Sequence, residues 1–311
     1  MDQVQTSSKA GQTWQDALVL LPAERWMLAV ICSFGVTSVF LTQALGREVN
    51  WPPFMAGFFG TFGLMVIGAY VRSRKDTPRL ALALIGVAIF MGFTAVSSLF
   101  IFSLFPLPRP LIDPWLTQVD AALGYHWPSF VQALAAYPGF AQALGLLYHS
   151  SLPQIVLTIC LLAALGRTVI LHRFLAVGIL TLIAAVAIWW VFPSIGPSGF
   201  FAIPEDVRLA TGLYFDSDYG AYLRQLVETG PARISPEVMT GVVAFPSYHM
   251  VMACMVVWFT RGTLLFLPAL VTNALMVPAT LSHGGHHLID LVAGVAVFAA
   301  CTFLAARIIR G

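Results

Sequence analysis

The sequence predicts an all-α fold, a polytopic bundle of about eight transmembrane helices. Hydrophobic residues make up 59% of the chain and charged residues only 10%, and the mean hydropathy is +0.84. These values lie far outside the range of soluble domains. The formal net charge is only +2, so no nucleic-acid partner is expected. The four cysteines lie in apolar runs without C-x-x-C spacing and predict neither disulfides nor a zinc site.

Eight apolar runs are candidates for membrane spans, since a helix needs roughly 20 apolar residues to cross a bilayer. In sequence order they are Trp26–Leu45, Phe54–Val71, Leu80–Phe105, Ala141–Leu165, Phe174–Phe192, Pro246–Phe259, Leu264–Thr280 and His287–Ala306. The sixth and seventh are short, and Arg261-Gly262 between them predicts a tight turn. Pro268 and Pro278 fall inside the seventh, where neighbouring helices can satisfy the freed backbone groups.

The sequence divides into two parts. Residues 1–79 contain a polar N-terminus, expected in the cytoplasm, and two accessory spans, whereas residues 80–311 contain a six-helix core. Two long polar stretches interrupt this core, Pro106–Phe140 and Pro193–Phe245. The first contains an amphipathic segment, Trp115–Leu123, that is predicted to form a helix on the membrane surface.

The basic residues predict the orientation. With eight spans, one set of loops contains Lys9, Arg25, Arg72, Arg74, Lys75, Arg79, Arg167, Arg173, Arg261, Arg307 and Arg310. The opposite set contains only Arg47, Arg109, Arg208, Arg224 and Arg233. Because basic loops stay in the cytoplasm, both termini are expected there. We expect an integral protein of the bacterial inner (plasma) membrane, with both polar stretches facing the periplasm or exterior.

A histidine-rich segment opens the last apolar run on this outer side. His286 and Asp290 are four residues apart, so their side chains share one helix face. A carboxylate at this offset can accept a hydrogen bond from one imidazole nitrogen and leave the other as a nucleophile or base. Gly284-Gly285 allows a bulky anion to approach the backbone closely. A His–Asp pair that only caps a helix is an equal alternative for this segment taken alone.

A second histidine segment opens the sixth apolar run. Pro246 suits the first turn of a helix and Ser247 suits its cap. The positive end of such a helix is an anion site, and His249 lies one turn in, where it can donate a proton to a leaving oxygen. An ordinary capped helix with a surface histidine is the simpler interpretation of this segment alone. Two such helix starts on one membrane face together favour phosphate chemistry.

Phe245-Pro246-Ser247-x-His249, followed by His286-x-x-x-Asp290-Leu291-x-Ala293-Gly294, resembles the membrane type-2 phosphatidic acid phosphatase superfamily. The resemblance implies a phosphorylated lipid as substrate and a phosphohistidine intermediate, without metal or other cofactor. His286 would be the nucleophile, Asp290 its partner, His249 the acid and Ser247 a phosphate contact. The likeness covers about residues 80–306.

The sequence departs from the family pattern in its cationic residues. Ala279 and Thr280 stand where the family commonly has Ser-Arg, and Phe102 stands where a lysine precedes Arg109-Pro110. Because phosphoryl transfer needs positive charge near the phosphate, other arginines would have to substitute. Arg109 and Arg224 are the leading candidates, with Arg233 a third. In lacking Ser-Arg, the sequence resembles the branch of the superfamily that contains inositol phosphorylceramide synthase and sphingomyelin-synthase-like phosphotransferases.

Polar residues early in the fourth apolar run are further candidates. Tyr148 and Gln154 are expected either to line a headgroup pocket or to hydrogen-bond between helices, and helix packing is the commoner role of such residues.

The sequence predicts neither the identity of the lipid, nor the acceptor (water or an alcohol), nor the oligomeric state.

Two other functions remain as alternatives. A non-enzymatic lipid transporter would have its site at the membrane midplane in broken, repeated helices, and no internal repeat is visible. His283-x-x-His286-His287 is also the spacing of membrane di-iron hydroxylases and desaturases. Those enzymes need several histidine boxes for a full ligand set, and the protein has seven histidines in all.

Overall fold

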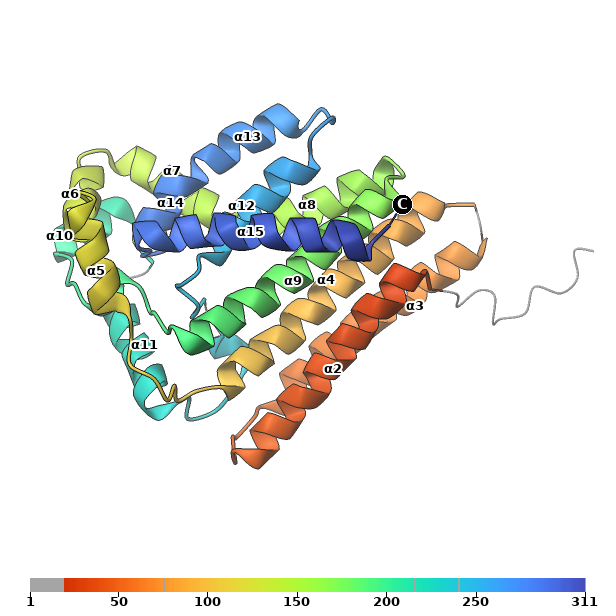
Figure 1. Ribbon diagram of the computed structural model, residues 1–311, viewed down its shortest axis with the longest axis horizontal. Coiled ribbons are helices and arrows are strands. Elements are labelled where there is room, and N and C mark those ends of the chain that lie inside the picture. Colours follow the sequence, from red (N-terminus) through yellow and green to blue (C-terminus); the bar gives the residue numbers. More distant parts are fainter. Residues whose placement is uncertain (1–19, 75, 215, 240, 311) are drawn as a thin grey trace, which may run out of the picture.

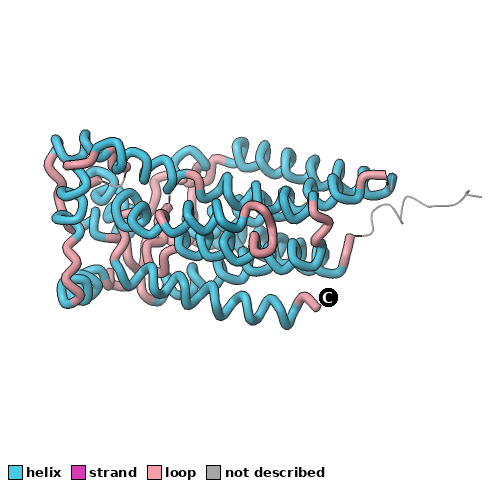
Figure 2. Tube along the Cα trace, turned by 90° about the horizontal axis from the view of Figure 1, so that it is seen from above, coloured by secondary structure: helices cyan, strands magenta, loops and turns pink. Residues whose placement is uncertain are grey.

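The computed structural model describes residues 20–74, 76–214, 216–239 and 241–310, and in these ranges the protein is helical without β-strands (Figures 1 and 2). A single isolated bridge joins Val49 and Ile234. The predicted cytoplasmic N-terminal segment, including Lys9, and Lys75 lie outside the described residues. The helical part agrees with the predicted all-α membrane bundle.

The helices follow the apolar runs, with short helices in the polar stretches. In sequence order they are α2 (Pro22–Ala44), α3 (Trp51–Arg74), α4 (Pro78–Ser103), α5 (Asp113–Ala122), α6 (Trp127–Ala135), α7 (Pro138–His149), α8 (Ser151–Ala164), α9 (Thr168–Val191), α10 (Glu205–Thr211), α11 (Ser217–Thr229), α12 (Tyr248–Phe259), α13 (Phe266–Ala274), α14 (Met276–His283) and α15 (Leu288–Ile308). Proline begins several of them, where its missing N–H costs no hydrogen bond.

The long helices run side by side, and the short helices gather at one end of the bundle. α5, α6, α10 and α11 form this end, on the left of Figure 1, and Figure 2 shows the same crowding from a second direction. The main apolar core lies among α4, α8, α9, α12 and α15. The two polar stretches therefore build one cap over the core.

Among the residues that the structure describes, six helices are long and apolar enough to cross a membrane when α13 and α14 are counted as one, or seven when the bent pair α6 and α7 is one span, whereas the sequence predicted eight spans. The predicted span Ala141–Leu165 is wrong as a single helix, because the helix breaks between α7 and α8. Pro153 lies in the first turn of α8 and has no N–H to bond the carbonyl of His149. The hydroxyl groups of Ser150 and Ser151 also donate to the carbonyls of Leu147 and Tyr148, which competes with helix hydrogen bonding.

The predicted span Pro246–Phe259 is also shorter in the structure. α12 begins only at Tyr248 and has 12 residues, which makes it about 18 Å long, well below the roughly 30 Å of a bilayer core. Pro246 precedes the cap residue instead of lying in the first turn. The cap residue Ser247 is fully buried, so α12 starts inside the molecule.

The accessory helices α2 and α3 are fixed to the core at the other end of the bundle. Glu24 of α2 is fully buried and accepts two hydrogen bonds from Arg72 of α3, at 2.6 and 2.7 Å. Its other neighbour is His172 of α9, with 3.3 Å between Nε2 and Oε1. Because a buried carboxylate is stable only when paired, these contacts attach both accessory helices to α9.

Candidate active site

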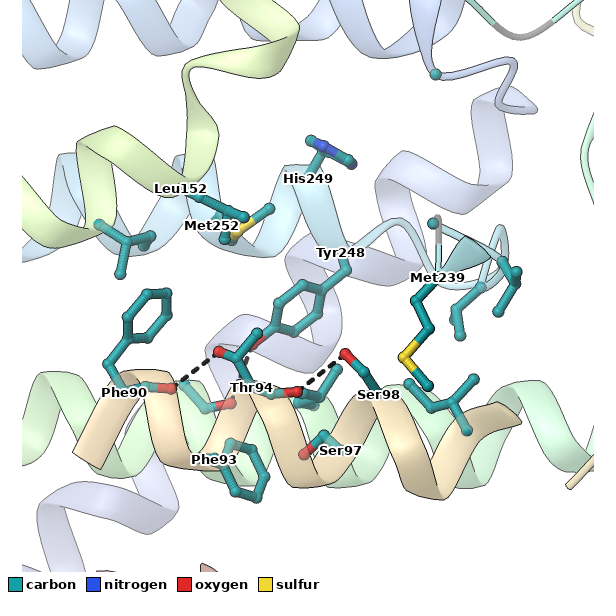
Figure 3. Close-up of a pocket in the computed structure, with 18 of the residues that line it drawn as sticks. Phe90, Phe93, Thr94, Ser97, Ser98, Leu152, Met239, Tyr248, His249 and Met252 are labelled. Atoms are coloured by element: carbon teal, nitrogen blue, oxygen red, sulfur yellow. Dashed lines mark hydrogen bonds between the residues drawn. The ribbon is translucent and has the colours of Figure 1, made fainter. Parts of the chain in front are cut away.

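A chamber of about 480 Å³ lies inside the bundle, between α4 on one side and α12 on the other (Figure 3). Residues of α8 and α9, together with Met239 and residues 241–244, complete its wall. Most of the lining is apolar and includes Phe90, Phe93, Ile155, Leu175, Met252 and Met255. Its volume is in the range of pockets that enclose small ligands. His249 and His286 both line this chamber.

His286 is held between a carboxylate and a helix cap. Its Nδ1 lies 3.1 Å from Oδ2 of Asp290, and its Nε2 lies 3.4 Å from the hydroxyl oxygen of Ser247. Asp290 is fully buried and His286 is 4% exposed. A proton on Nδ1, donated to Asp290, leaves the Nε2 lone pair directed toward Ser247. This is the arrangement of an oriented nucleophile or base.

Ser247 caps α12, as its sequence position predicts. Its hydroxyl oxygen accepts from the N–H of Met250, and its own N–H donates to the carbonyl of Asp290 at 3.0 Å. The α12 start is thereby fastened to the first turn of α15. The two histidine segments meet here, at the positive end of a helix that favours anions.

His249 lies on the opposite side of α12 from Tyr248, which points toward α4 (Figure 3). The ring of Tyr148 stacks on it, with 3.9 Å between ring centroids. A Cβ on Gly284 would lie 2.8 Å from both the Tyr148 ring and the His286 ring. Tyr148 therefore occupies the space between the two histidine segments, and only glycine fits at position 284.

Three other candidates lie outside the chamber wall. Arg109 is an exposed residue whose Nη1 bonds the carbonyl of Val191 at 3.4 Å. Arg224 bonds the carbonyl of Gly199 and stacks on Phe200. Gln154 accepts from Asn273 at 2.8 Å and so joins α8 to α13, which is the helix-packing role.

The chamber wall is short of positive charge. Among its described lining residues there is no arginine or lysine; the polar ones near the histidine pair are Tyr148, His149 and Tyr214. The geometry therefore gives no support to Arg109 or Arg224 as phosphate contacts in this conformation.

The structure also reveals polar residues that the sequence analysis missed. His287 is buried and lies between two carboxylates of α5, with Nδ1 2.6 Å from Asp120 and Nε2 3.6 Å from Asp113. The available signal was the seven-residue spacing of the two aspartates, which places them on one face of a helix. Nothing in the sequence paired that face with His287, however.

His287 precedes the first residue of α15, and its pKa is strongly affected by these neighbours. Burial alone would lower the pKa of this imidazole, but the contacts with the carboxylates of Asp113 and Asp120 and the nearby charge of Asp290 outweigh burial and raise the pKa to about 9. His287 is therefore an imidazolium cation at neutral pH.

No cluster of three or more histidine, cysteine or acidic side chains has the geometry to hold a metal ion, in the part of the protein that the structure describes. The di-iron alternative therefore has no ligand set among these residues.

The fold and the site define a class: a helical membrane protein with an oriented imidazole beside the capped start of a helix. The model of the PAP2 superfamily, the type-2 phosphatidic acid phosphatases, matches residues 114–304, and the protein belongs to this superfamily. The match includes both histidine segments and supports a membrane phosphatase or phosphotransferase kind of function. No curated protein and no solved structure matches this sequence.

Proposed function

We propose that this protein is an integral membrane enzyme that removes or transfers the phosphoryl headgroup of a lipid through a phosphohistidine. The observation that carries the proposal is the contact between His286, oriented by Asp290, and the capped start of α12, at an apolar chamber. The family model covers both segments. A transporter has no need of such an oriented imidazole.

In the first step, Nε2 of His286 attacks phosphorus and the bond from phosphorus to the lipid oxygen breaks. His249 donates a proton to that oxygen, so the lipid leaves as a neutral alcohol. The positive charge that forms on the His286 ring is stabilised by Asp290, which accepts the Nδ1 hydrogen bond.

In the second step, an oxygen of water or of an alcohol attacks phosphorus and the P–N bond breaks. His249, now unprotonated, accepts the proton of the incoming oxygen, and the electron pair of the P–N bond returns to His286. Water as acceptor gives inorganic phosphate, whereas an alcohol gives a new phospholipid. The resemblance to the inositol phosphorylceramide synthase branch favours the alcohol.

The positive end of α12 and the two imidazoles surround the expected position of the phosphate. Donors and dipoles fixed before the reaction stabilise charge better than mobile groups. No arginine or lysine lines the described wall. We therefore assign stabilisation of the negative charge on the phosphate mainly to Ser247 and the positive end of α12.

The chamber extends from the histidines into the bundle and supports a lipid as substrate. Along α4 its lining runs from Phe102 to Ile89, about 20 Å at 1.5 Å per residue. Two imidazoles in one part of the wall and apolar side chains along the rest match a phosphorylated headgroup with a hydrocarbon tail. One tail of the lipid would fill this space.

The active site is expected to face away from the cytoplasm. Arg167 donates a hydrogen bond to the carbonyl of Gly262, and Arg173 donates one to the carbonyl of Ile309. Both arginines therefore lie at the end of the bundle where α15 ends. The histidine segments lie toward the opposite end, near α5. Since basic residues stay in the cytoplasm, this separation supports the predicted orientation.

Purified protein incubated with a panel of phospholipids and alcohol acceptors will test the proposal. We expect release of inorganic phosphate or formation of a new phospholipid, because both follow from the same phosphohistidine. Phosphate and lipid products are measured in the same reaction. If neither forms with any lipid while the protein remains folded, the transporter alternative is favoured.

The chamber predicts how activity depends on the length of the lipid tail. For monomeric alkyl phosphates from butyl to octyl, kcat/KM should rise by up to about fourfold for each methylene buried. Thr94→Trp places an indole in the chamber, so the rise should stop at a shorter tail. Ala95→Trp, on the exposed face of the same helix, is the control and should keep the wild-type dependence. Equal tail-length profiles for the two variants would contradict a lipid tail in the chamber.

A further inference from the structure

The turn that carries the proposed nucleophile is attached to α5 through His287. The side chain of His287 is 1% exposed, and its Nδ1 lies 2.6 Å from Oδ2 of Asp120. The other oxygen of Asp120 accepts the backbone N–H of Leu288 at 3.0 Å. One carboxylate thus holds both the side chain that follows the nucleophile and the first N–H of α15. The contact between His287 and Asp120 is shorter than an ordinary N–H···O hydrogen bond, as expected when the donor and the acceptor are both charged.

The second carboxylate of α5, that of Asp113, contacts both His287 and the loop of residues 194–196. Oδ1 of Asp113 lies 3.6 Å from Nε2 of His287 and accepts hydrogen bonds from the Ser194 hydroxyl at 2.9 Å and the Gly196 N–H at 2.7 Å. Gly196 has a φ of 81° and packs directly against the carbonyl of Gly285. The turn of residues 284–287 is therefore enclosed by α5 on one side and this loop on the other.

The same residue also contacts the partner of the nucleophile. The backbone N–H of His287 donates to Oδ2 of Asp290 at 2.9 Å, which is the oxygen that accepts from His286. Any rotation of the His287 backbone would move this donor and with it the Asp290 carboxylate. The position of His287 therefore determines the geometry of the His286–Asp290 pair.

Charge explains why a histidine suits this position. Asp113, Asp120 and Asp290 are all nearly or fully buried, and buried carboxylates are costly unless paired. In the described part of the protein, the ion pairs of Asp113 and Asp120 are both with His287. Only an imidazolium has an N–H on both nitrogens, so it can face one aspartate with each.

We infer that His287 is a positioning residue: an imidazolium between Asp113 and Asp120 that fixes the turn of the nucleophile and thereby the His286–Asp290 hydrogen bond. It does not touch the reacting phosphate and acts through Asp290. This role rests on the proposed function, because its effect is read out as turnover.

The inference gives turnover a defined alkaline limit. The groups that face His287 are Asp113 and Asp120 of α5 and Asp290 of α15, with Tyr125 close to two of these carboxylates. Burial, then the charges of Asp120 and Asp290, raise the pKa of Tyr125 well above its ordinary range, so Tyr125 stays neutral. The pKa of His287 is about 9, above the ordinary value of about 6.5. Its stabilising contribution is therefore complete below about pH 6.5 and lost as pH rises through about 9.

The experiment compares kcat and KM across pH for the wild type, Asp113→Asn and His287→Gln, in membranes. Wild-type kcat should fall above about pH 9. Asp113→Asn keeps an oxygen acceptor for the loop but removes one charge, so this fall should move to lower pH. His287→Gln should lower kcat about tenfold to a hundredfold, the cost of small misplacements, with little change in KM and without the alkaline fall.

Asp206→Asn, an exposed change on α10, is the matched control and should behave as the wild type. The inference is overturned if His287→Gln keeps the wild-type kcat and alkaline limb, or if Asp113→Asn leaves the limb unmoved. Should His287→Gln fail to accumulate, the wild-type and Asp113→Asn profiles still decide. His286→Ala in the same assay separates the two ideas: residual turnover there would refute the proposed function, whatever His287 does.

Discussion

Replacing His286 with alanine is expected to abolish turnover, by at least about 10⁵-fold, as loss of a covalent nucleophile does in other double-displacement enzymes. The imidazole is the group that forms the bond to phosphorus, and the neighbouring Ser247 hydroxyl is a far weaker nucleophile without a base of its own. Substrate labelled with radioactive phosphate should give a protein-bound phosphoryl group in the wild type. That bond should be stable in alkali and labile in acid, as a P–N bond is, and absent from His286→Ala.

His126→Ala is the matched control for this variant. His126 is an exposed histidine at the same end of the bundle, so the change should leave both turnover and labelling intact. Labelling that survives His286→Ala would show that another residue is the nucleophile. Normal expression and the same thermal unfolding midpoint in both variants would exclude a folding defect.

Replacing His249 with alanine is expected to lower turnover of alkyl phosphate lipids by about 10²–10⁴-fold, the usual contribution of a general acid. The physical reason is the leaving oxygen, which is a poor leaving group unless it is protonated. A 4-nitrophenyl phosphate ester has a leaving group that needs no proton. Its first turnover, measured as a burst of nitrophenolate, should therefore fall less than about tenfold in this variant.

The second step should remain slow in His249→Ala for both substrates, because the same imidazole accepts the proton of the incoming oxygen. The phosphoprotein should consequently accumulate, and quenched samples will measure it directly. His286→Ala should give no burst with either substrate. Equal losses for the alkyl and nitrophenyl leaving groups would contradict the assignment of His249 as the acid.

Several features of this site were predicted from sequence because they are local. The His286–Asp290 contact follows from their four-residue spacing on one helix, and the Ser247 cap follows from its position before an apolar run. The apolar runs likewise predicted an all-helical membrane fold. The break between α7 and α8 was missed because hydropathy alone does not register the lost N–H of Pro153.

The cationic residues show where sequence reasoning stopped. Arg109 and Arg224 were chosen because they lie in outward loops, but loop position does not specify the direction of a side chain. In the structure both bond backbone carbonyls outside the chamber wall. Asp120, which contacts the turn of His286, lies in the segment noted only for its amphipathic character, and Asp113 lies two residues before that segment.

The sequence by itself determined the class of this protein, the apolar runs at whose starts His249 and His286 lie, and the pairing of His286 with Asp290. These depend on backbone periodicity and on apolar length, which are properties of neighbouring residues. Only the tertiary structure decided that Tyr148 stacks on His249, and that His287 meets Asp120 across 167 sequence positions. Such contacts depend on how helices pack around a shared chamber, and one-dimensional spacing contains no information about which faces meet.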